Sequence, residues 1–272
     1  MSEPDLGSSA NHSAFDEIAS SYDSVFVRTS VMRAQRRTVW TVAKNNFRPG
    51  ARILELNCGT GEDALFLARL GLSVVACDAS KGMIEVAQRR KKLECNDLPI
   101  TFLAVPTERI LSVAQAASFD GVFSNFSGLN FVRDLDQVVE DLAALTRPRA
   151  QLLLCVASRI CLWETLWFSA HLQLRQAVRR FSGFTVGRVG SSPIDVWYRS
   201  IHHFRRRFSP FFRLHNICAV GLCVPPYYVE PWAQRHQRSL RVAETCDRIL
   251  QRIPLLRVLG DHVLLHFEKR AQ

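Results

Sequence analysis

Apolar residues along this chain alternate between short unbroken runs, which predict buried strands, and segments with three- and four-residue spacing, which predict amphipathic helices. The clearest example begins with an apolar run at 52–56, continues through a small-residue loop at 57–61, and becomes a helical pattern over 63–70 that ends at a glycine. A second buried run over 72–77 ends in Asp78. This pattern predicts a βαβ unit with a carboxylate at the tip of its second strand.

The remaining elements repeat the order of strand and helix. Helices are predicted over 31–46, 81–92, 135–145, 200–208 and 229–253, and strands over 100–104, 119–126, 151–156, 212–220 and 261–268, with a turn at 147–150. This order predicts an α/β fold with a doubly wound sheet.

The segment between the fifth and sixth strands, residues 158–211, is too long for a simple connection. Its apolar residues share one helical face and its arginines gather at the end of that face: Ile160, Trp163, Leu166, Trp167, Ala170, Leu174 and Phe181, then Arg175, Arg179 and Arg180. The segment is either a lid over a substrate pocket or an amphipathic surface for a bilayer. The lid is favoured because it buries the aromatics, and it places Trp163, Trp167 and Phe168 against the substrate.

The loop at 57–61 is a candidate ligand site. Gly59 and Gly61 allow left-handed backbone angles and close approach of a ligand to the main chain. Asp78 is placed to hold the hydroxyls of an adenosine ribose. A dinucleotide would bring its pyrophosphate to the helix start, where Glu62 and Asp63 oppose it, whereas cationic S-adenosylmethionine suits acidic neighbours such as Glu55.

The segment 55–62, Glu-Leu-Asn-Cys-Gly-Thr-Gly-Glu, resembles motif I of the class I S-adenosylmethionine-dependent methyltransferases. It is most similar to the branch of ubiquinone and menaquinone C-methyltransferases, and the resemblance covers residues 15–157. It implies a seven-stranded, mainly parallel Rossmann-like sheet whose last strand is antiparallel, here with a helical lid insertion. The chain departs from the family at Asn57, where a glycine is usual, and at Pro106, near the adenine-binding aspartate, for which Thr107 or backbone groups substitute.

Loop and resemblance together predict the cofactor site. Its residues are Tyr22, Glu55, Asn57, Cys58, Gly59, Gly61, Asp78, Ala79, Met83, Thr107, Asn125 and Phe126. The resemblance implies that Tyr22 closes over the cofactor near the methyl group and that Met83 packs against adenine, while Asn125 and Phe126 lie at the C-terminal end of the predicted fourth strand, where ligands bind. The candidates for a general base are His202 and His203, and no metal site is predicted.

Charge divides the chain into unlike halves. Residues 1–150 contain 17 Lys/Arg and 18 Asp/Glu, a net charge of −1, whereas residues 151–272 contain 18 and 7, a net charge of +11. The basic half indicates an acidic substrate, a membrane surface or nucleic acid. Eight cysteines without metal or CxxC spacing, and no apolar run of the ~18 residues that a membrane span requires, predict a cytoplasmic protein with reduced thiols.

The leading hypothesis is a methyltransferase that acts by in-line transfer on a small apolar or acidic molecule, such as a quinone, phenol, polyketide or lipid precursor. The alternatives are an RNA methyltransferase, a non-catalytic binding protein with this fold, and a nicotinamide-dependent reductase. Peripheral membrane contact through the basic, aromatic lid is a further hypothesis, and the oligomeric state is left open. The predicted divisions are a disordered terminus (1–14), a cofactor-binding core (15–157), the lid and following helix (158–211), and the last strands with a helical insertion (212–272).

Overall fold

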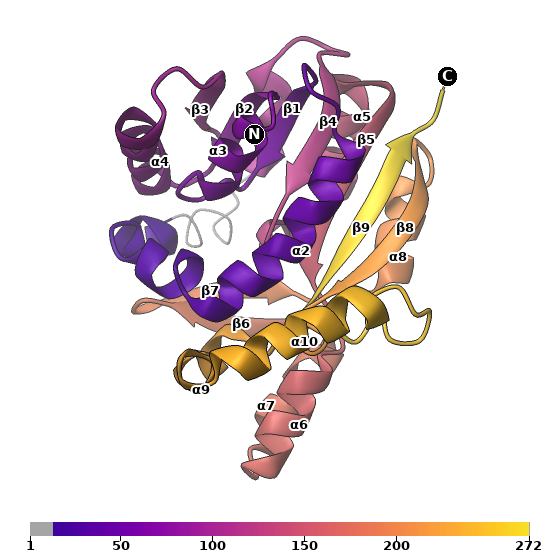
Figure 1. The fold of residues 1–272 in the computed structure, drawn as a ribbon. Coiled ribbons are helices and arrows are strands. Elements are labelled where there is room, and N and C mark those ends of the chain that lie inside the picture. The colour runs from indigo at the N-terminus through magenta and orange to yellow at the C-terminus, as the bar shows by residue number, and fades with distance from the viewer. Residues whose placement is uncertain (1–12, 272) are drawn as a thin grey trace.

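The computed structural model describes residues 13–271 and contains a seven-stranded sheet with the order β3-β2-β1-β4-β5-β9-β8 (Figure 1). Its strands are β1 (Arg52–Leu56), β2 (Ser73–Asp78), β3 (Ile100–Ala104), β4 (Phe119–Ser124), β5 (Thr146–Ala157), β8 (Phe212–Val220) and β9 (His262–Lys269). The pairs from β3 to β5 are parallel, and β9 runs antiparallel to both of its neighbours. The predicted fold class is confirmed, including the antiparallel last strand.

Helices cover both faces of this sheet. One face carries α2 (Ser30–Asn46), α3 (Glu62–Arg69) and α4 (Lys81–Glu94), and the other carries α5 (Asp136–Leu145) and α8 (Ile201–Phe208). Successive strand residues point to opposite faces, so Ile53 packs in the cluster with α2 and α3, while Leu54 and Leu56 pack in the cluster with α5 and α8. Burial on both faces explains why the central strands are continuous apolar runs in the sequence.

Three helices begin at hydroxyl residues that cap them. The side chains of Thr29, Ser80 and Ser200 accept hydrogen bonds from backbone N–H groups in the first turns of α2, α4 and α8. The predicted strands and helices are present with small shifts at their ends. The turn predicted at 147–150 is wrong: these residues belong to β5, which begins at Thr146 beside Phe119 of β4.

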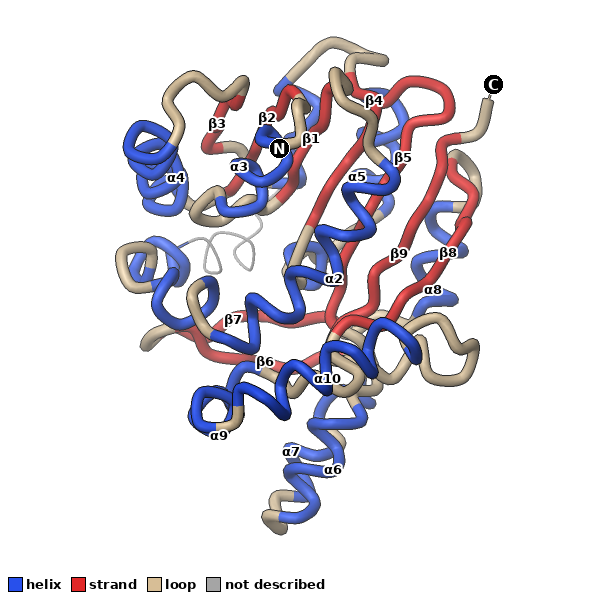
Figure 2. Tube along the Cα trace, in the orientation of Figure 1, coloured by secondary structure: helices blue, strands red, loops and turns tan. Residues whose placement is uncertain are grey.

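The segment after β5 differs from the predicted helical lid. Helices α6 (Leu162–Ala170) and α7 (Leu174–Ala177) project from the body, as Figure 1 shows. A two-stranded hairpin follows, β6 (Phe184–Val189) and β7 (Ser192–Trp197), which Figure 2 shows crossing near the edge where the parallel strands end. Side chains along this hairpin alternate between more and less exposed, a period of two that the sequence interpretation missed.

The predicted helical insertion after β8 is present as α9 (Glu230–Arg235) and α10 (Gln237–Leu250). Both pack on α2, and the Glu230 carboxylate accepts hydrogen bonds from the backbone N–H groups of Ser30 (2.8 Å) and Val31 (2.9 Å). This acid satisfies donors at the start of α2 that would otherwise lack partners.

Most of the N-terminal segment predicted to be disordered, residues 1–12, lies outside the described residues, whereas residues 13–18 are helical. In the range 13–271, no helix has the length and apolar character that a bilayer span requires.

Candidate active site

A cavity of about 330 Å³ lies at the edge of the sheet where β1, β2 and β4 end. One half is built from the loops after these three strands, together with Met83 and Thr107, and is called the loop half here. The other half is built from the hairpin β6–β7, the N-terminal segment, Phe131 and Val132, residues 226–228 and the start of β9, with Glu164, Arg179 and Arg180 from the segment before the hairpin, and is called the hairpin half. The position agrees with the rule that ligands of doubly wound sheets bind beyond the carboxyl ends of the strands.

The backbone of the loop half is fixed by glycines and a carboxylate. Gly61 has a φ of +78°, and a Cβ there would lie 2.9 Å from both Ala87 and Phe102, so only glycine fits between helix and strand. Gly59, with a φ of +53°, donates its N–H to Asp78 Oδ2 at 2.8 Å. Asp78 Oδ1 accepts from the N–H of Ser80 at 2.9 Å, so the carboxylate has a fixed orientation in the cavity wall.

Asn57 also lies in this loop, and the structure accounts for its departure from the usual glycine. Its φ is +53°, a left-handed angle that asparagine tolerates better than most residues. Its Oδ1 accepts a hydrogen bond from Thr107 Oγ1 at 3.2 Å. A Cβ added at Gly128 would lie 2.5 Å from Asn57 Cβ, so the asparagine side chain occupies space that only a glycine opposite leaves open.

The acids at the start of α3 are paired, which corrects the expectation of an uncompensated negative charge. Asp63 accepts hydrogen bonds from Arg36, from Trp40 Nε1 at 2.5 Å and from Asn125 Nδ2 at 3.1 Å. Glu62 pairs with Arg90. Because both carboxylates have arginine partners, they do not by themselves select a cationic ligand.

The structure brings most of the predicted cofactor residues together. Those that line the cavity are Tyr22, Asn57, Cys58, Gly59, Asp78, Ala79, Met83, Thr107, Asn125 and Phe126. Glu55 is not among them: it is only 1% exposed, and burial raises its pKa well above the ordinary value. Gly61 is also not a lining residue, and its role is the close packing described above.

An N-terminal clamp, defined here as residues 13–27, closes one side of the cavity. Asp16 accepts hydrogen bonds from Ser80 Oγ at 2.5 Å and from the Gly82 N–H at 2.9 Å, and Glu17 accepts from Ser191 Oγ at 2.9 Å in the hairpin turn. These bonds tie the clamp to both halves of the cavity.

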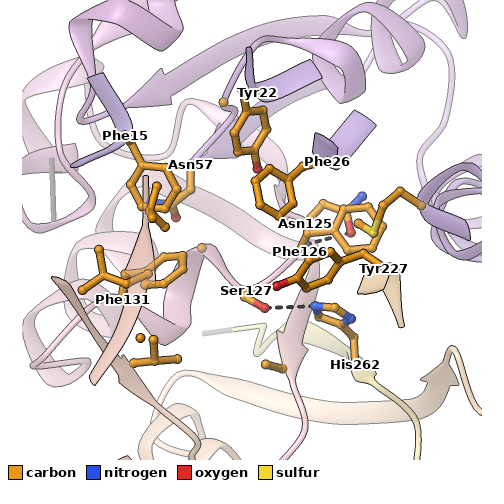
Figure 3. Close-up of a pocket in the computed structure, with 18 of the residues that line it drawn as sticks. Phe15, Tyr22, Phe26, Asn57, Asn125, Phe126, Ser127, Phe131, Tyr227 and His262 are labelled. Carbon is orange, nitrogen blue, oxygen red and sulfur yellow. Dashed lines mark hydrogen bonds between the residues drawn. The ribbon is translucent and has the colours of Figure 1, made fainter. Parts of the chain in front are cut away.

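The clamp brings aromatic rings into the cavity (Figure 3). Tyr22 lies 5.0 Å from Phe26, and Phe15 lies 5.3 Å from Phe131, between ring centroids. Burial raises the pKa of Tyr22 to about 12, so its hydroxyl stays protonated at neutral pH.

The hairpin half has walls that are largely apolar. Its lining includes Phe15, Phe26, Phe131, Val132, Val189, Ile194, Val196, Tyr198, Tyr227 and Tyr228. Asn130 fixes the hairpin to the sheet, because its Nδ2 donates to the carbonyl of Trp197 at 2.7 Å and its Oδ1 accepts from the N–H of Ala157 at 2.8 Å.

The prediction that Trp163, Trp167 and Phe168 contact the substrate is wrong, because none of them lines the cavity. Trp163 Nε1 instead donates to the Cys223 carbonyl at 3.0 Å. Residues 226–228, which follow β8, contribute Pro226, Tyr227 and Tyr228 to the lining.

The predicted bases His202 and His203 also lie outside the cavity lining, in the first turn of α8. The structure places a different histidine in the cavity: His262, whose Nε2 lies 3.0 Å from Ser127 Oγ (Figure 3). The sheet topology could have indicated His262, since an antiparallel strand starts at the edge where its parallel neighbours end. That rule puts the first residue of β9 beside the last residue of β5, Ala157.

Comparison with known proteins places this geometry in a family. The family described as "Methyltransferase domain" matches residues 53–149. The demethylmenaquinone methyltransferase of Parafrankia sp. (strain EAN1pec) is 31% identical over 199 residues, which cover 68% of this chain and 75% of that protein. The chain belongs to the class I S-adenosylmethionine-dependent methyltransferase family.

Other relatives match over a shorter range. The demethylmenaquinone methyltransferase of Streptomyces avermitilis is 32% identical over 146 residues, which cover 53% of this chain and 58% of that protein. The chain spans 58 to 60% of the length of several curated relatives that it matches. Among solved structures, the [4+2]-cyclase SpnF has a TM-score of 0.66 at 15% identity and covers 99% of both chains, which shows the shared fold.

S-adenosylmethionine is the cofactor of this family, and the residues of the loop half fit it. Asp78 is held by two backbone N–H groups at the cavity wall, where its carboxylate can accept from ribose hydroxyls. Met83 and Thr107 line the same part of the cavity and offer an apolar surface and a hydroxyl to adenine. The positive φ at Gly59 opens the main chain to close approach by a ligand.

Proposed function

We propose that the protein transfers a methyl group from S-adenosylmethionine to a small, largely apolar acceptor with an ionisable hydroxyl, such as a quinol or phenol. The observation that carries this proposal is the continuity of the cavity: the loop half, with Asp78 and Gly59, opens directly into an aromatic and aliphatic chamber. Cofactor and acceptor would therefore meet without intervening water, beside the end of β4.

The size and lining of the chamber favour a flat ring system as the acceptor. The whole cavity, which would hold cofactor and acceptor together, has a volume of about 330 Å³, at the lower end of the range for small-molecule sites, so its hairpin half would take only a small acceptor. Rings from Phe15, Phe131 and Tyr227 line it, and aromatic side chains pack favourably on flat rings. The relatives named demethylmenaquinone methyltransferase support a reduced quinone within this class, whereas polyketides and lipid precursors are broader alternatives.

The chain's own residues would bind, orient and enclose the reactants. When bound, S-adenosylmethionine supplies an electrophilic methyl group on a positively charged sulfur. Asp78 and Met83 would hold the nucleoside end, and Asn125 and Phe126 at the end of β4 would contact the reacting region. The N-terminal clamp and the hairpin would exclude water while the acceptor is bound.

This proposal is tested by incubating the protein with methyl-labelled S-adenosylmethionine and a dithionite-reduced demethylated menaquinone. Label should appear in the quinol fraction and stay absent in the Asp78→Ala variant. Cofactor binding without transfer to any quinol, phenol or other small acceptor would favour the non-catalytic binding protein. Label transferred only to added RNA would favour the RNA methyltransferase instead.

We also propose peripheral contact with a bilayer, through the exposed leucines of the predicted surface rather than through its arginine cluster. Arg179 and Arg180 both pair with Glu164, and Arg180 is buried, so these two arginines do not form a free cationic patch. The projecting α6–α7 arm instead exposes Leu166 (59%), Leu172 (87%) and Leu174 (65%). Exposed leucines beside a basic residue such as Arg175 are typical of surfaces that insert shallowly into a membrane.

The membrane proposal is tested by co-sedimentation with vesicles that contain phosphatidylserine. The wild type should sediment with the vesicles, and replacing Leu166, Leu172 and Leu174 with serine should release it. Leu93→Ser is a matched control, because Leu93 is 80% exposed on α4, far from the arm in the fold. Equal sedimentation of the arm variant and the wild type would reject the arm as the contact. The predicted cytoplasmic location stays a prediction beside this proposal.

A further inference from the structure

A chain of buried charged groups runs from the base of the α6–α7 arm into the cavity. Glu164, whose side chain is 2% exposed, pairs with Arg180 at 2.7 Å, and Arg180 Nη2 pairs with Asp261 Oδ1 at 2.8 Å. Asp261 precedes His262, whose Nε2 lies 3.0 Å from Ser127 Oγ at the cavity wall. Buried charges with this many partners are held in one arrangement.

These buried charged groups orient the imidazole of His262. Its Nδ1 is buried, lies 3.4 Å from Asp261 Oδ2, and has no other polar partner among residues 13–271. The contact does not have hydrogen-bond geometry, but a negative charge beside Nδ1 favours the tautomer with its proton there, which leaves the lone pair of Nε2 directed at Ser127 and the cavity. Phe126 packs edge-on against the ring at 5.3 Å and limits its rotation.

Asp261 is the charged member of this pair. Burial alone would raise its pKa, but the positive charges of His262 and Arg180 outweigh that effect and hold the pKa well below the ordinary value. An ionised Asp261 places a negative charge 3.4 Å from Nδ1 of His262, on the side of the ring opposite Ser127. Arg180 lies on the far side of Asp261, and Arg36 lies over the Phe126 ring at 4.8 Å.

We infer that His262 accepts, at Nε2, the hydroxyl proton of the methyl acceptor, with Asp261 and Arg180 as positioning residues. The inference rests on the proposed function for its acceptor. In the step, the O–H bond of the acceptor breaks, the proton moves to Nε2, and the electron pair stays on the acceptor, which becomes the stronger nucleophile. In the structure, Ser127 Oγ lies within hydrogen-bonding distance of Nε2. This contact marks the place where the hydroxyl of an acceptor would bind.

The same three residue types, serine, histidine and aspartate, also occur in enzymes with a serine nucleophile. Ser127 has a φ of +70°, a left-handed angle for a non-glycine residue in the turn after a strand. In that alternative Ser127 would attack a substrate and become acylated, so a fluorophosphonate probe would label it covalently. Our inference predicts no labelling of Ser127.

The proton transfer is tested without methyl transfer, using 4-nitrophenol, whose ionised form absorbs visible light. The probe is bound to the protein saturated with S-adenosylhomocysteine, and its ionised fraction is measured between pH 5.5 and 8. His262→Gln should reduce the ionised fraction about tenfold at pH 6, which corresponds to about one unit in the pKa of the bound phenol. His202→Gln, an exposed histidine outside the cavity, should match the wild type.

Asp261→Asn separates positioning from simple structural support. It should move the ionisation of the bound probe to higher pH and leave the affinity for S-adenosylhomocysteine unchanged. That affinity also shows that each variant is folded. A wild type that does not ionise the probe, a His262→Gln variant that ionises it equally, or fluorophosphonate labelling of Ser127 would overturn the inference. None of these results would affect the proposed function, because methyl transfer to the reduced quinone is measured separately.

Discussion

The two halves of the cavity are built from the sequence in opposite ways. The loop half comes from residues that follow strands β1 to β4, within 57–128. The hairpin half joins the N-terminal clamp, β6–β7, residues 226–228 and His262, and Phe15 of the clamp lies 247 positions before His262 in the chain. Cofactor geometry is therefore encoded locally in this chain, whereas acceptor geometry depends on the whole fold.

The largest effect should come from the loop half. Asp78→Ala removes a carboxylate that can hold two ribose hydroxyls by charge-assisted hydrogen bonds of about 1.5–3 kcal/mol each, so affinity for S-adenosylhomocysteine should fall about 100-fold or more. The variant also loses the acceptor for the Gly59 N–H. Calorimetry measures the affinity, and an unchanged dissociation constant in a folded variant would remove Asp78 from the site.

The next effect tests how tightly the loop half is packed. Gly128→Ala would place a Cβ 2.5 Å from Asn57 Cβ, and overpacking of this kind costs about 1–3 kcal/mol of unfolding free energy. The double variant Asn57→Gly/Gly128→Ala removes the clash and should recover most of the loss. Thermal unfolding measures both variants, and an equally unstable double variant would show that Asn57 is not the cause.

A smaller effect should distinguish acceptor binding in the hairpin half from cofactor binding in the loop half. Ile194→Ala removes buried methyl groups from the wall of the hairpin half. The loss of about 1–2 kcal/mol of binding free energy should raise the KM for the quinol roughly five- to thirtyfold. Affinity for S-adenosylhomocysteine should not change. The matched control is Ile249→Ala on α10, where the isoleucine is 69% exposed. An equal loss of cofactor affinity in Ile194→Ala would show that the halves are not separable.

The smallest effect is expected at the position that departs from the family. Asn57→Gly restores the family residue, keeps the left-handed backbone angle, and removes the hydrogen bond with Thr107 and the packing against Gly128. Cofactor affinity should change by less than about 1 kcal/mol, because a neutral hydrogen bond contributes little net free energy. A loss of more than tenfold by calorimetry would give the asparagine a direct role in binding.

The sequence was sufficient to predict the sheet, the flanking helices and most of the loop half. Hydrophobic periodicity and the segment 55–62 depend on neighbouring residues, so both are readable without tertiary contacts. Glu55 was misplaced because its burial follows from the layer beneath the loop, which its spacing does not reveal.

The hairpin half was beyond this kind of prediction. The six-residue strands of β6–β7 lie inside a segment whose apolar spacing also suits a helix. The segment was therefore predicted to be helical. Arg180 was expected in a cluster with Arg175 and Arg179 at the end of a helical face, but its partners Glu164 and Asp261 come from positions 16 residues before and 81 residues after it in the chain. His262 was overlooked for the same reason, since only the antiparallel pairing of β9 with β5 brings it to the cavity.

The most direct test of a divided cavity is calorimetric titration of S-adenosylhomocysteine, with NAD in parallel, into the wild type, Asp78→Ala, Ile194→Ala and His262→Gln. We predict one binding site for S-adenosylhomocysteine in the wild type and no binding of NAD. Binding should be nearly lost in Asp78→Ala and retained in the two variants of the hairpin half. No heat with S-adenosylhomocysteine in the wild type, or the same affinity in Asp78→Ala, would contradict the account.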